Sequence, residues 1–329
     1  MERAEPSTPG SARGIVLLAG AAMALLLLAG TPAARAAYPG TDGRIAFVRD
    51  GGIYSVKSDG TGILRLTTVA GDSQPVWSPD GRRIAFVRGG QIWTMNANGS
   101  AQTRVTSAGG AHPTWSPDGR WLAFDRGSVY KLRSTPPYGK AVLLAAAGAG
   151  DACPVSYKPA WSATGTIAYI HDQRSCDPDD VGPSIYTINP DGSGKTFITR
   201  CACFDMNEVN GPDNQIDWGP RGFALLYVNF IPDPLASGPG FFGGSDVYVH
   251  LANGTTTNLS AGLATYYYDQ NAAYSPSGSR IVFDRRYTNP YQGTTGVDKA
   301  LGIWMMNADG SARHRIVAIG SDPNWGRLP

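Results

Sequence analysis

Short apolar stretches separated by turn residues run through the chain from residue 45 to its end. Residues 45–48 and 53–56 are the first two stretches. The pair Asp59-Gly60 that follows them favours a tight turn, because glycine adopts positive φ without steric cost. The next unit adds an apolar stretch in front, residues 75–77. No long helical spacing of apolar residues appears beyond the N-terminal segment, so the pattern predicts units of four short β-strands.

The most complete unit, residues 74–95, recurs along the chain. Its Asp-Gly turn has counterparts 38 residues apart at Asp42, Asp80 and Asp118, which is close to the length of one propeller blade. Decayed units follow at residues 161–192, 217–254 and 274–310, and residues 322–326 repeat the front strand that the first unit lacks. The sequence predicts an all-β fold over residues 37–329. It is a six-bladed β-propeller of four-stranded blades, and its C-terminal strand closes the ring and removes the open sheet edge.

The repeat resembles a known family. Trp-Ser-Pro-Asp-Gly-Arg-Arg-Ile-Ala-Phe-Val at residues 77–87, followed by Ile-Trp-Thr-Met-Asn-Ala-Asn-Gly-Ser at residues 92–100, is similar to the repeats of bacterial TolB-type six-bladed propellers, the WD40-like PD40 family. The resemblance covers about residues 38–329 and implies the propeller fold. For function it implies several roles, because such propellers serve as docking modules, as caps on peptidases and as lyase scaffolds.

Residues 1–36 have the pattern of a secretory signal peptide. Arg3 and Arg13 precede an apolar run at residues 15–29, and Ala34-Arg35-Ala36 fits a cleavage site. An uncleaved anchor is the competing interpretation, but the run is shorter than the roughly 20 residues of a spanning helix. We therefore expect an exported protein, secreted or periplasmic in the cell envelope, with no stable membrane span after cleavage.

Composition and net charge limit the kinds of partner that we expect. The formal net charge is only +2 and charged residues are 16 % of the chain, so no strong field attracts nucleic acid. We predict no cofactor, no metal and a monomer, although Asp205, Glu208 and Asp213 lie close enough in sequence to offer oxygen ligands to Ca²⁺. In an exported chain four cysteines predict disulfides, in which the first two each pair with one of the last two: Cys153, Cys176, Cys201 and Cys203.

Strand direction predicts which loops share a face. The Asp-Gly turns are short and repeated, so we expect them on one face of the ring. The opposite face receives the long insertions at residues 201–214, 229–246 and 286–300. Loops of this length are uncommon in a compact fold without a role, so we expect ligand or partner contacts on this loop-rich face.

A polar residue stands three positions before the front-strand aromatic of every unit. These six residues, here called the polar collar, are predicted to surround the channel mouth and bind a ligand: Gln74, His112, Lys158, Gln215, Asn271 and Asp322. The alternative is that they cap strand ends and hold channel water. The aromatics themselves are predicted to pack between blades: Trp77, Trp115, Trp161, Trp218, Tyr274 and Trp325.

A second, mostly cationic set follows the second strand of five units on the same face. Its members are candidates for contacts with an anion or with a partner's carboxylate: Arg49, Arg88, Arg126, His171 and Arg285. The alternative is that they pair with acids of nearby loops, such as Asp72, Asp205 or Asp269.

Two functional hypotheses remain. The first is an exported, non-enzymatic propeller that binds a protein, peptide or glycan of the cell envelope through the loop-rich face and channel mouth. The second is a carbohydrate-active, lyase-like enzyme that draws its acid and base from His112, Lys158 or the tyrosines at 266–268. A catalyst needs a base and a partner within hydrogen-bond reach in one pocket. The sequence contains no Gly-x-Ser-x-Gly elbow of a serine hydrolase.

Overall fold

The computed structural model describes residues 39–146, 155–172, 183–201, 216–219, 222–232, 243–262, 266–287 and 299–329. The chain divides into a unit of residues 1–33 and a unit of residues 34–329, and the description below concerns the second. The predicted signal peptide lies outside the described residues. Within the described part of the chain, we find no helix of the length and apolarity needed to cross a membrane.

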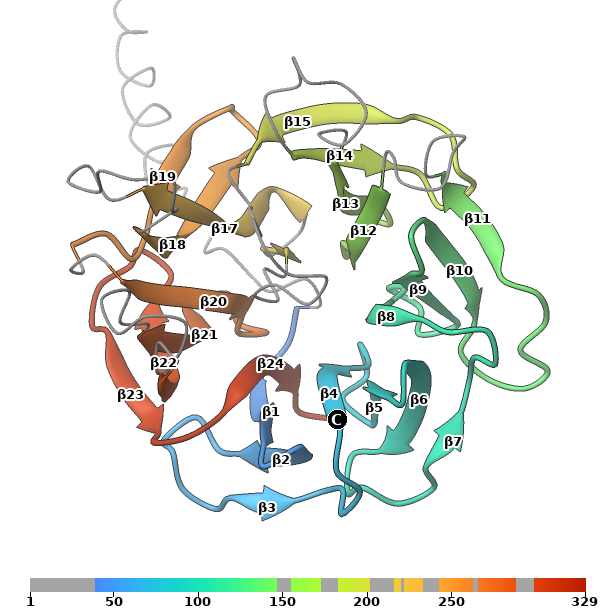
Figure 1. The fold of residues 1–329 in the computed structure, drawn as a ribbon, viewed down its shortest axis with the longest axis horizontal. Helices are drawn as coiled ribbons and strands as arrows, with labels where there is room; N and C mark the ends of the chain where they lie inside the picture. The colour runs from blue at the N-terminus through green and yellow to red at the C-terminus, as the bar shows by residue number, and fades with distance from the viewer. Residues whose placement is uncertain are drawn as a thin grey trace, which may run out of the picture. The chain divides into compact units, whose positions relative to one another are not determined.

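The regular elements of this unit are strands, joined by hydrogen bonds into five sheets that stand around a common centre (Figure 1). Four sheets have four strands each. The first contains β24 (Ser321–Arg327), β1 (Asp42–Arg49), β2 (Gly52–Val56) and β3 (Leu64–Arg65). The second contains β4 (Asp72–Trp77), β5 (Arg83–Arg88), β6 (Gln91–Asn96) and β7 (Thr103–Arg104).

The third and fourth sheets repeat the same antiparallel order. The third contains β8 (Ala111–Trp115), β9 (Trp121–Asp125), β10 (Val129–Arg133) and β11 (Val142–Ala145). The fourth contains β12 (Val155–Trp161), β13 (Ile167–Asp172), β14 (Ser184–Ile188) and β15 (Thr196–Arg200). The prediction of four short antiparallel strands per unit is confirmed for these sheets.

The fifth sheet has eight strands, which differs from the six separate sheets predicted. It contains β16 (Asp217–Trp218), β17 (Ala224–Pro232), β18 (Gly243–Leu251), β19 (Thr256–Asn258), β20 (Tyr267–Tyr274), β21 (Arg280–Tyr287), β22 (Lys299–Asn307) and β23 (His314–Val317). Each half is antiparallel, and one parallel pairing between Ser245 and Tyr268 joins them. The two halves join because β18 is long enough for its first residues to reach the start of β20.

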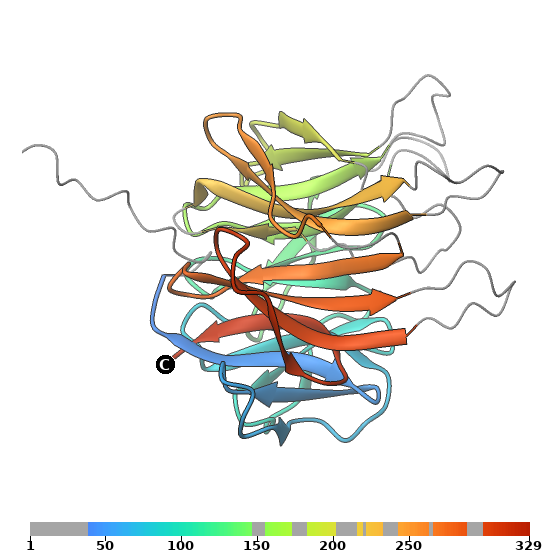
Figure 2. The same ribbon diagram turned by 90° about the vertical axis from the view of Figure 1, so that its left-hand side faces the viewer.

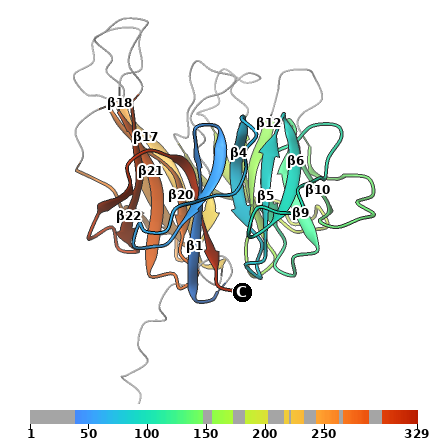
Figure 3. The same ribbon diagram turned by 90° about the horizontal axis from the view of Figure 1, so that it is seen from below.

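The innermost strand of each unit contacts the innermost strand of the next. The contacts run from β24 to β4, β8, β12, β16 and β20, and β20 contacts β24 in turn. The C-terminal strand β24 pairs with β1, with Trp325 opposite Ile45, as the sequence predicted. The side views in Figures 2 and 3 show the strands running side by side through the unit. We call the space that these inner strands surround the channel.

The core consists of apolar clusters between neighbouring sheets. Ile53 of the first sheet packs with Trp77 and Phe86 of the second, and Trp325 of the first sheet packs in one cluster with Ala273 and Val282 of the fifth. The six front-strand aromatics are all buried, with at most 8 % of their surface exposed. They therefore pack between sheets, as predicted.

Trp325 gives a direct test of the C-terminal strand's structural role. We expect Trp325→Ala to lower the free energy of unfolding by about 3–5 kcal/mol, because it empties a buried site between the first and fifth sheets. Phe223→Ala is the matched control, since Phe223 is 62 % exposed and its loss should change stability by about 0.5 kcal/mol or less. Urea denaturation monitored by far-ultraviolet circular dichroism measures the stability of both variants. Equal stabilities of the two variants would contradict the proposed contribution of β24.

Candidate functional site

The polar collar lies at a repeated irregularity of the inner strands. Five of its six members have φ between 47° and 54°: Gln74, His112, Lys158, Asn271 and Asp322. Each falls where the register with the second strand of its unit shifts, as expected of a β-bulge. Proline follows the bulge in four units, where a missing N–H costs no ladder bond: Pro75, Pro113, Pro159 and Pro323. The sixth member, Gln215, lies outside the described residues.

The collar residues bond to one another from unit to unit. The backbone N–H of Gln74 donates to Oδ2 of Asp322 at 3.2 Å, and the N–H of His112 donates to Oε1 of Gln74 at 2.7 Å. A bulge residue at positive φ is held only where surrounding contacts fix it. These side chains therefore cap the neighbouring bulge, which was the alternative role considered for them from the sequence.

Two further aspartates take part, and the sequence analysis missed both. Oδ2 of Asp125 lies 2.7 Å from Nδ1 of His112 and accepts the backbone N–H of Lys158 at 2.7 Å. The signal for these residues is the tripeptide Phe-Asp-Arg, which occurs at 124–126 and again at 283–285.

Asp284 is the counterpart of Asp125 in the last unit. Its Oδ1 accepts Nδ2 of Asn271 at 2.8 Å and the N–H of Asp322 at 3.2 Å. The same Nδ2 also donates to Oδ1 of Asp322 at 3.0 Å. Asp125 and Asp284 are buried, so their carboxylates hold the collar residues by hydrogen bonds inside the protein and do not line an open surface.

A small cavity of about 40 Å³ lies beside the collar. We call it the mouth cavity, since the collar stands at the start of the inner strands, at the end away from the Asp-Gly turns. It brings together Gln74, His112 and Lys158 from three different sheets. Its walls are otherwise mostly apolar: Val76, Pro113, Pro159, Ala160, Ile216 and Ala273. Asn271 and Asp322 do not line it and instead hold the collar from within the protein.

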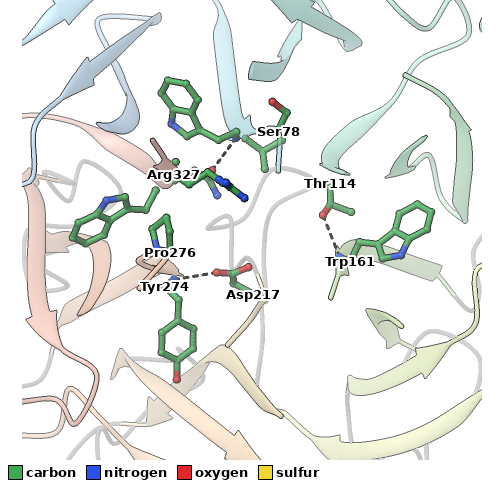
Figure 4. Close-up of a pocket in the computed structure, with 12 residues that line it drawn as sticks. Ser78, Thr114, Trp161, Asp217, Tyr274, Pro276 and Arg327 are labelled. Atoms are coloured by element: carbon green, nitrogen blue, oxygen red, sulfur yellow. Dashed lines mark hydrogen bonds between the residues drawn. The ribbon is translucent and has the colours of Figure 1, made fainter. Parts of the chain in front are cut away.

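A second small cavity, also of about 40 Å³, lies further along the channel, toward the Asp-Gly turns (Figure 4). We call it the inner cavity. It shares Val76, Thr114, Asp217 and Asn324 with the mouth cavity, so these residues stand where the two cavities meet. Figure 4 shows Thr114 bonded to Trp161 of the next sheet, and Asp217 bonded to Tyr274 within the eight-stranded sheet.

Asp217 is the acid of this shared region. Burial raises the pKa of its carboxyl to about 7, and the backbone N–H groups of Tyr274 and Trp218 only partly favour the ionised form. The Tyr274 N–H donates to Oδ2 at 3.0 Å. The same burial, together with the charge of Asp217, raises the pKa of the Tyr274 hydroxyl above its ordinary range. The sequence analysis placed Asp217 in a strand and did not consider it as a site residue.

The second predicted set is largely engaged with the protein itself. Arg88 makes two bonds to Asp72, at 2.6 and 2.7 Å, and Arg285 makes two to Asp269, at 2.6 and 2.9 Å. These are the ion pairs given as the alternative role. A ring nitrogen of His171 lies 2.9 Å from the hydroxyl of Ser156.

Stacking on third-strand aromatics also holds these cations. Arg49 lies 4.3 Å from the ring centre of Tyr54, and Arg126 lies 4.7 Å from that of Tyr130. Arg126 remains exposed and donates to the carbonyl of Ala108 at 2.9 Å. The structure therefore spreads this set along the rims of the sheets and does not converge it on one anion.

Other predicted residues fall elsewhere or outside the described part. Tyr267 and Tyr268 begin β20 and Tyr266 immediately precedes it, and none of the three is among the described residues that line the two cavities. Cys201 is buried in the core. Cys153, Cys176 and Cys203, and most of the three long insertions, lie outside the described residues, so the disulfide pairing stays a prediction.

Comparison of the sequence with models of known protein families and with curated proteins gave no match. Among solved structures, a TolB-type protein from Agrobacterium tumefaciens is similar, with a TM-score of 0.57 and 16 % identity over 85 % of this chain and 90 % of that one. A chain of a nidogen/laminin complex has a TM-score of 0.56 and 11 % identity over 86 % and 98 %. At these identities the likeness shows the fold alone, an all-β, propeller-like fold.

Asp217 predicts a pH dependence of stability. Because its folded-state pKa is about 7 against an ordinary 3.8, the folded protein binds more protons in this window and loses stability as the pH rises through it. Asp217→Asn keeps an oxygen for the Tyr274 N–H and removes the ionisation. We expect the free energy of unfolding of the variant to rise relative to that of wild type as the pH increases, by at most about 4 kcal/mol above pH 8. Denaturation at pH 5 and pH 8.5 measures the difference, and a gain independent of pH would contradict the assignment.

Proposed function

We propose that this protein is an exported, non-enzymatic propeller that binds a protein, peptide or glycan of the cell envelope at its channel mouth. The observation that carries the proposal is the mouth cavity, which combines polar groups from three sheets with apolar walls. Export rests on the sequence of residues 1–36. Binding pockets of this kind are concave, mostly apolar and supplied with a few fixed polar groups.

The same proposal includes a ring of six blades closed by β24. In its support, the eight-stranded sheet consists of two antiparallel halves joined at one residue pair. The inner strands of the six units also contact one another in sequence from β24 back to β24. We therefore count the eight-stranded sheet as two blades.

The collar suits recognition because its members are fixed before a ligand arrives. Gln74 and His112 are held through backbone bonds to neighbouring units, and Asp125 holds both His112 and the backbone of Lys158. A site that is ordered in advance loses less conformational entropy on binding. The adjacent Pro113 and Pro159 add stiff apolar surface at the same opening.

Lys158 provides the test, because it is the lysine that lines the mouth cavity and its substitution keeps the backbone N–H bond to Asp125. We expect Lys158→Met to weaken binding of ligands retained by residues 37–329 on peptide and glycan arrays by about tenfold, the loss of one charge-assisted hydrogen bond. Lys140→Met changes an exposed lysine on an outer loop and should bind as wild type. Ligands bound equally by both variants, or no ligand on either array, would count against a site at the mouth.

One observation favours the lyase alternative. The Nδ1 of His112 is paired with buried Asp125, an arrangement that orients an imidazole as a general base. Lys158 lines the same cavity and offers a positive charge to the carboxylate of a uronic acid. In β-elimination the base removes the proton next to that carboxylate, the bond to the leaving sugar oxygen breaks, and a carbon–carbon double bond forms.

The binding proposal predicts that the wild-type protein forms no unsaturated uronides from uronic acid polymers, as followed by ultraviolet absorbance. If product forms, His112→Gln should lower the rate by about 10²-fold or more for a true general base. Lys140→Met serves again as the control for handling and purity. Product formation by wild type and its loss in His112→Gln would replace the binding proposal with the lyase.

A further inference from the structure

Two positions after the collar, the inner strands place a second ring of side chains, here called the waist. In unit order these are Asn324, Val76, Thr114, Ala160, Asp217 and Ala273. Polar and apolar side chains alternate around the waist, so that every second unit contributes one oxygen-bearing group. All six line the mouth cavity, and Asn324, Thr114 and Asp217 also line the inner cavity.

Each of the three polar waist residues makes the same kind of hydrogen bond to a neighbouring unit. Oδ1 of Asn324 accepts the N–H of Trp77 at 3.0 Å, and Oγ1 of Thr114 accepts the N–H of Trp161 at 3.1 Å. Oδ2 of Asp217 accepts the N–H of Tyr274 at 3.0 Å. Each bond reaches from one unit to the front-strand aromatic of the next. These bonds fix the three side chains, so their positions do not depend on a ligand.

Each of these groups has acceptor capacity beyond that bond. An amide oxygen and a hydroxyl oxygen each have two lone pairs, and a carboxylate offers about four acceptor sites. The three residues thus present oxygens with remaining capacity at the junction of two cavities. The other three waist residues, Val76, Ala160 and Ala273, supply apolar surface between them.

Asp217 places a negative charge in this ring without an ion pair from the described residues. The charged side chains that line the adjoining cavities are Lys158 and His112 on one side and Arg327 on the other. None of them contributes to the shift of its pKa, whose causes are burial and two backbone N–H bonds. An acid without a charged partner resists ionisation, which agrees with the raised pKa of Asp217, and a cation placed beside it would stabilise the carboxylate.

We propose that the waist binds a primary ammonium group, which donates its three N–H bonds to Asp217, Thr114 and Asn324. One carboxylate with two neutral oxygen acceptors matches the three N–H groups of an ammonium better than Ca²⁺, which takes six to eight oxygens. The inference deepens the proposed function, because it rests on a ligand that enters at the mouth and extends its cationic end to the waist. Peptide N-termini, lysine side chains and amino sugars share this chemistry.

Tryptophan fluorescence reports on the site, because Trp77, Trp161 and Trp325 line the inner cavity. The probes are triglycine amide for an N-terminus, Nα-acetyl-lysine amide for a side chain and glucosamine for a sugar. N-acetyl-triglycine amide and N-acetylglucosamine are the neutral counterparts. We expect saturable binding of at least one amine and none of its acetylated counterpart. Equal responses to amine and counterpart, or displacement of the amine by CaCl₂ rather than by NaCl of the same ionic strength, would overturn the proposal.

Two variants with opposite expected effects sharpen the test. Asp217→Asn keeps the Tyr274 bond and removes the charge, so amine affinity should fall by about tenfold or more. Asn324→Asp keeps an acceptor for Trp77 and adds a charge, so affinity should rise. Asp50→Asn changes an exposed aspartate and should match wild type. Unchanged affinity in both waist variants would overturn the ammonium site.

Lys158→Met separates this inference from the function on which it rests. That variant should lose array ligands yet keep the small amines, whose contacts lie at the waist. If no amine binds to wild type while Lys158-dependent ligands do, the waist proposal fails and the mouth proposal stands. For Nα-acetyl-lysine amide, affinity should also fall between pH 8 and pH 5.5 as Asp217 is protonated, and a pH-independent affinity would contradict its role.

Discussion

The arrangement depends on one recurring interaction, a hydrogen bond that crosses from one inner strand to the next. In one layer the N–H of a bulged collar residue meets a side-chain oxygen, as between Gln74 and Asp322. In a second layer the N–H of a front-strand aromatic does the same, as between Trp77 and Asn324. Apolar clusters between sheets provide most of the burial, but they are not directional. The crossing bonds fix the position of each inner strand relative to its neighbour.

This constraint also decides what remains for a ligand. An oxygen that caps a buried N–H cannot be removed without leaving that group unsatisfied, which costs about 1–3 kcal/mol. Asp322 is used in this way, and Asn271 donates its Nδ2 to Asp322 and Asp284. Neither residue lines the mouth cavity. The backbone N–H of Lys158 donates to Asp125, and the residue also lines the mouth cavity. Asp217 combines both roles, because one carboxylate oxygen caps Tyr274 while the group also lines the channel.

The cations outside the channel follow a different rule. Arg88 and Arg285 are paired with Asp72 and Asp269, and both also stack near the third-strand aromatics Trp93 and Trp304. Removing one partner of such a buried pair would leave an uncompensated charge, which is strongly destabilising. These arginines therefore stabilise the sheets at their loop-rich ends, and the channel is the better place to look for ligand chemistry.

Repeat spacing and turn residues in the sequence were enough to predict the all-β, propeller-like fold, the four-stranded units and the pairing of residues 322–326 with the first strand. The repeated register also predicted that the collar residues share one level of the channel, and five of them lie at the same kind of bulge. The sequence did not show that β18 and β20 join two units into one sheet, since strand length there is set by contacts beyond the repeat. Nor did it single out Asp125, Asp284 or Asp217. Their roles depend on which N–H of a neighbouring unit each carboxylate meets, and only the tertiary structure brings those groups together.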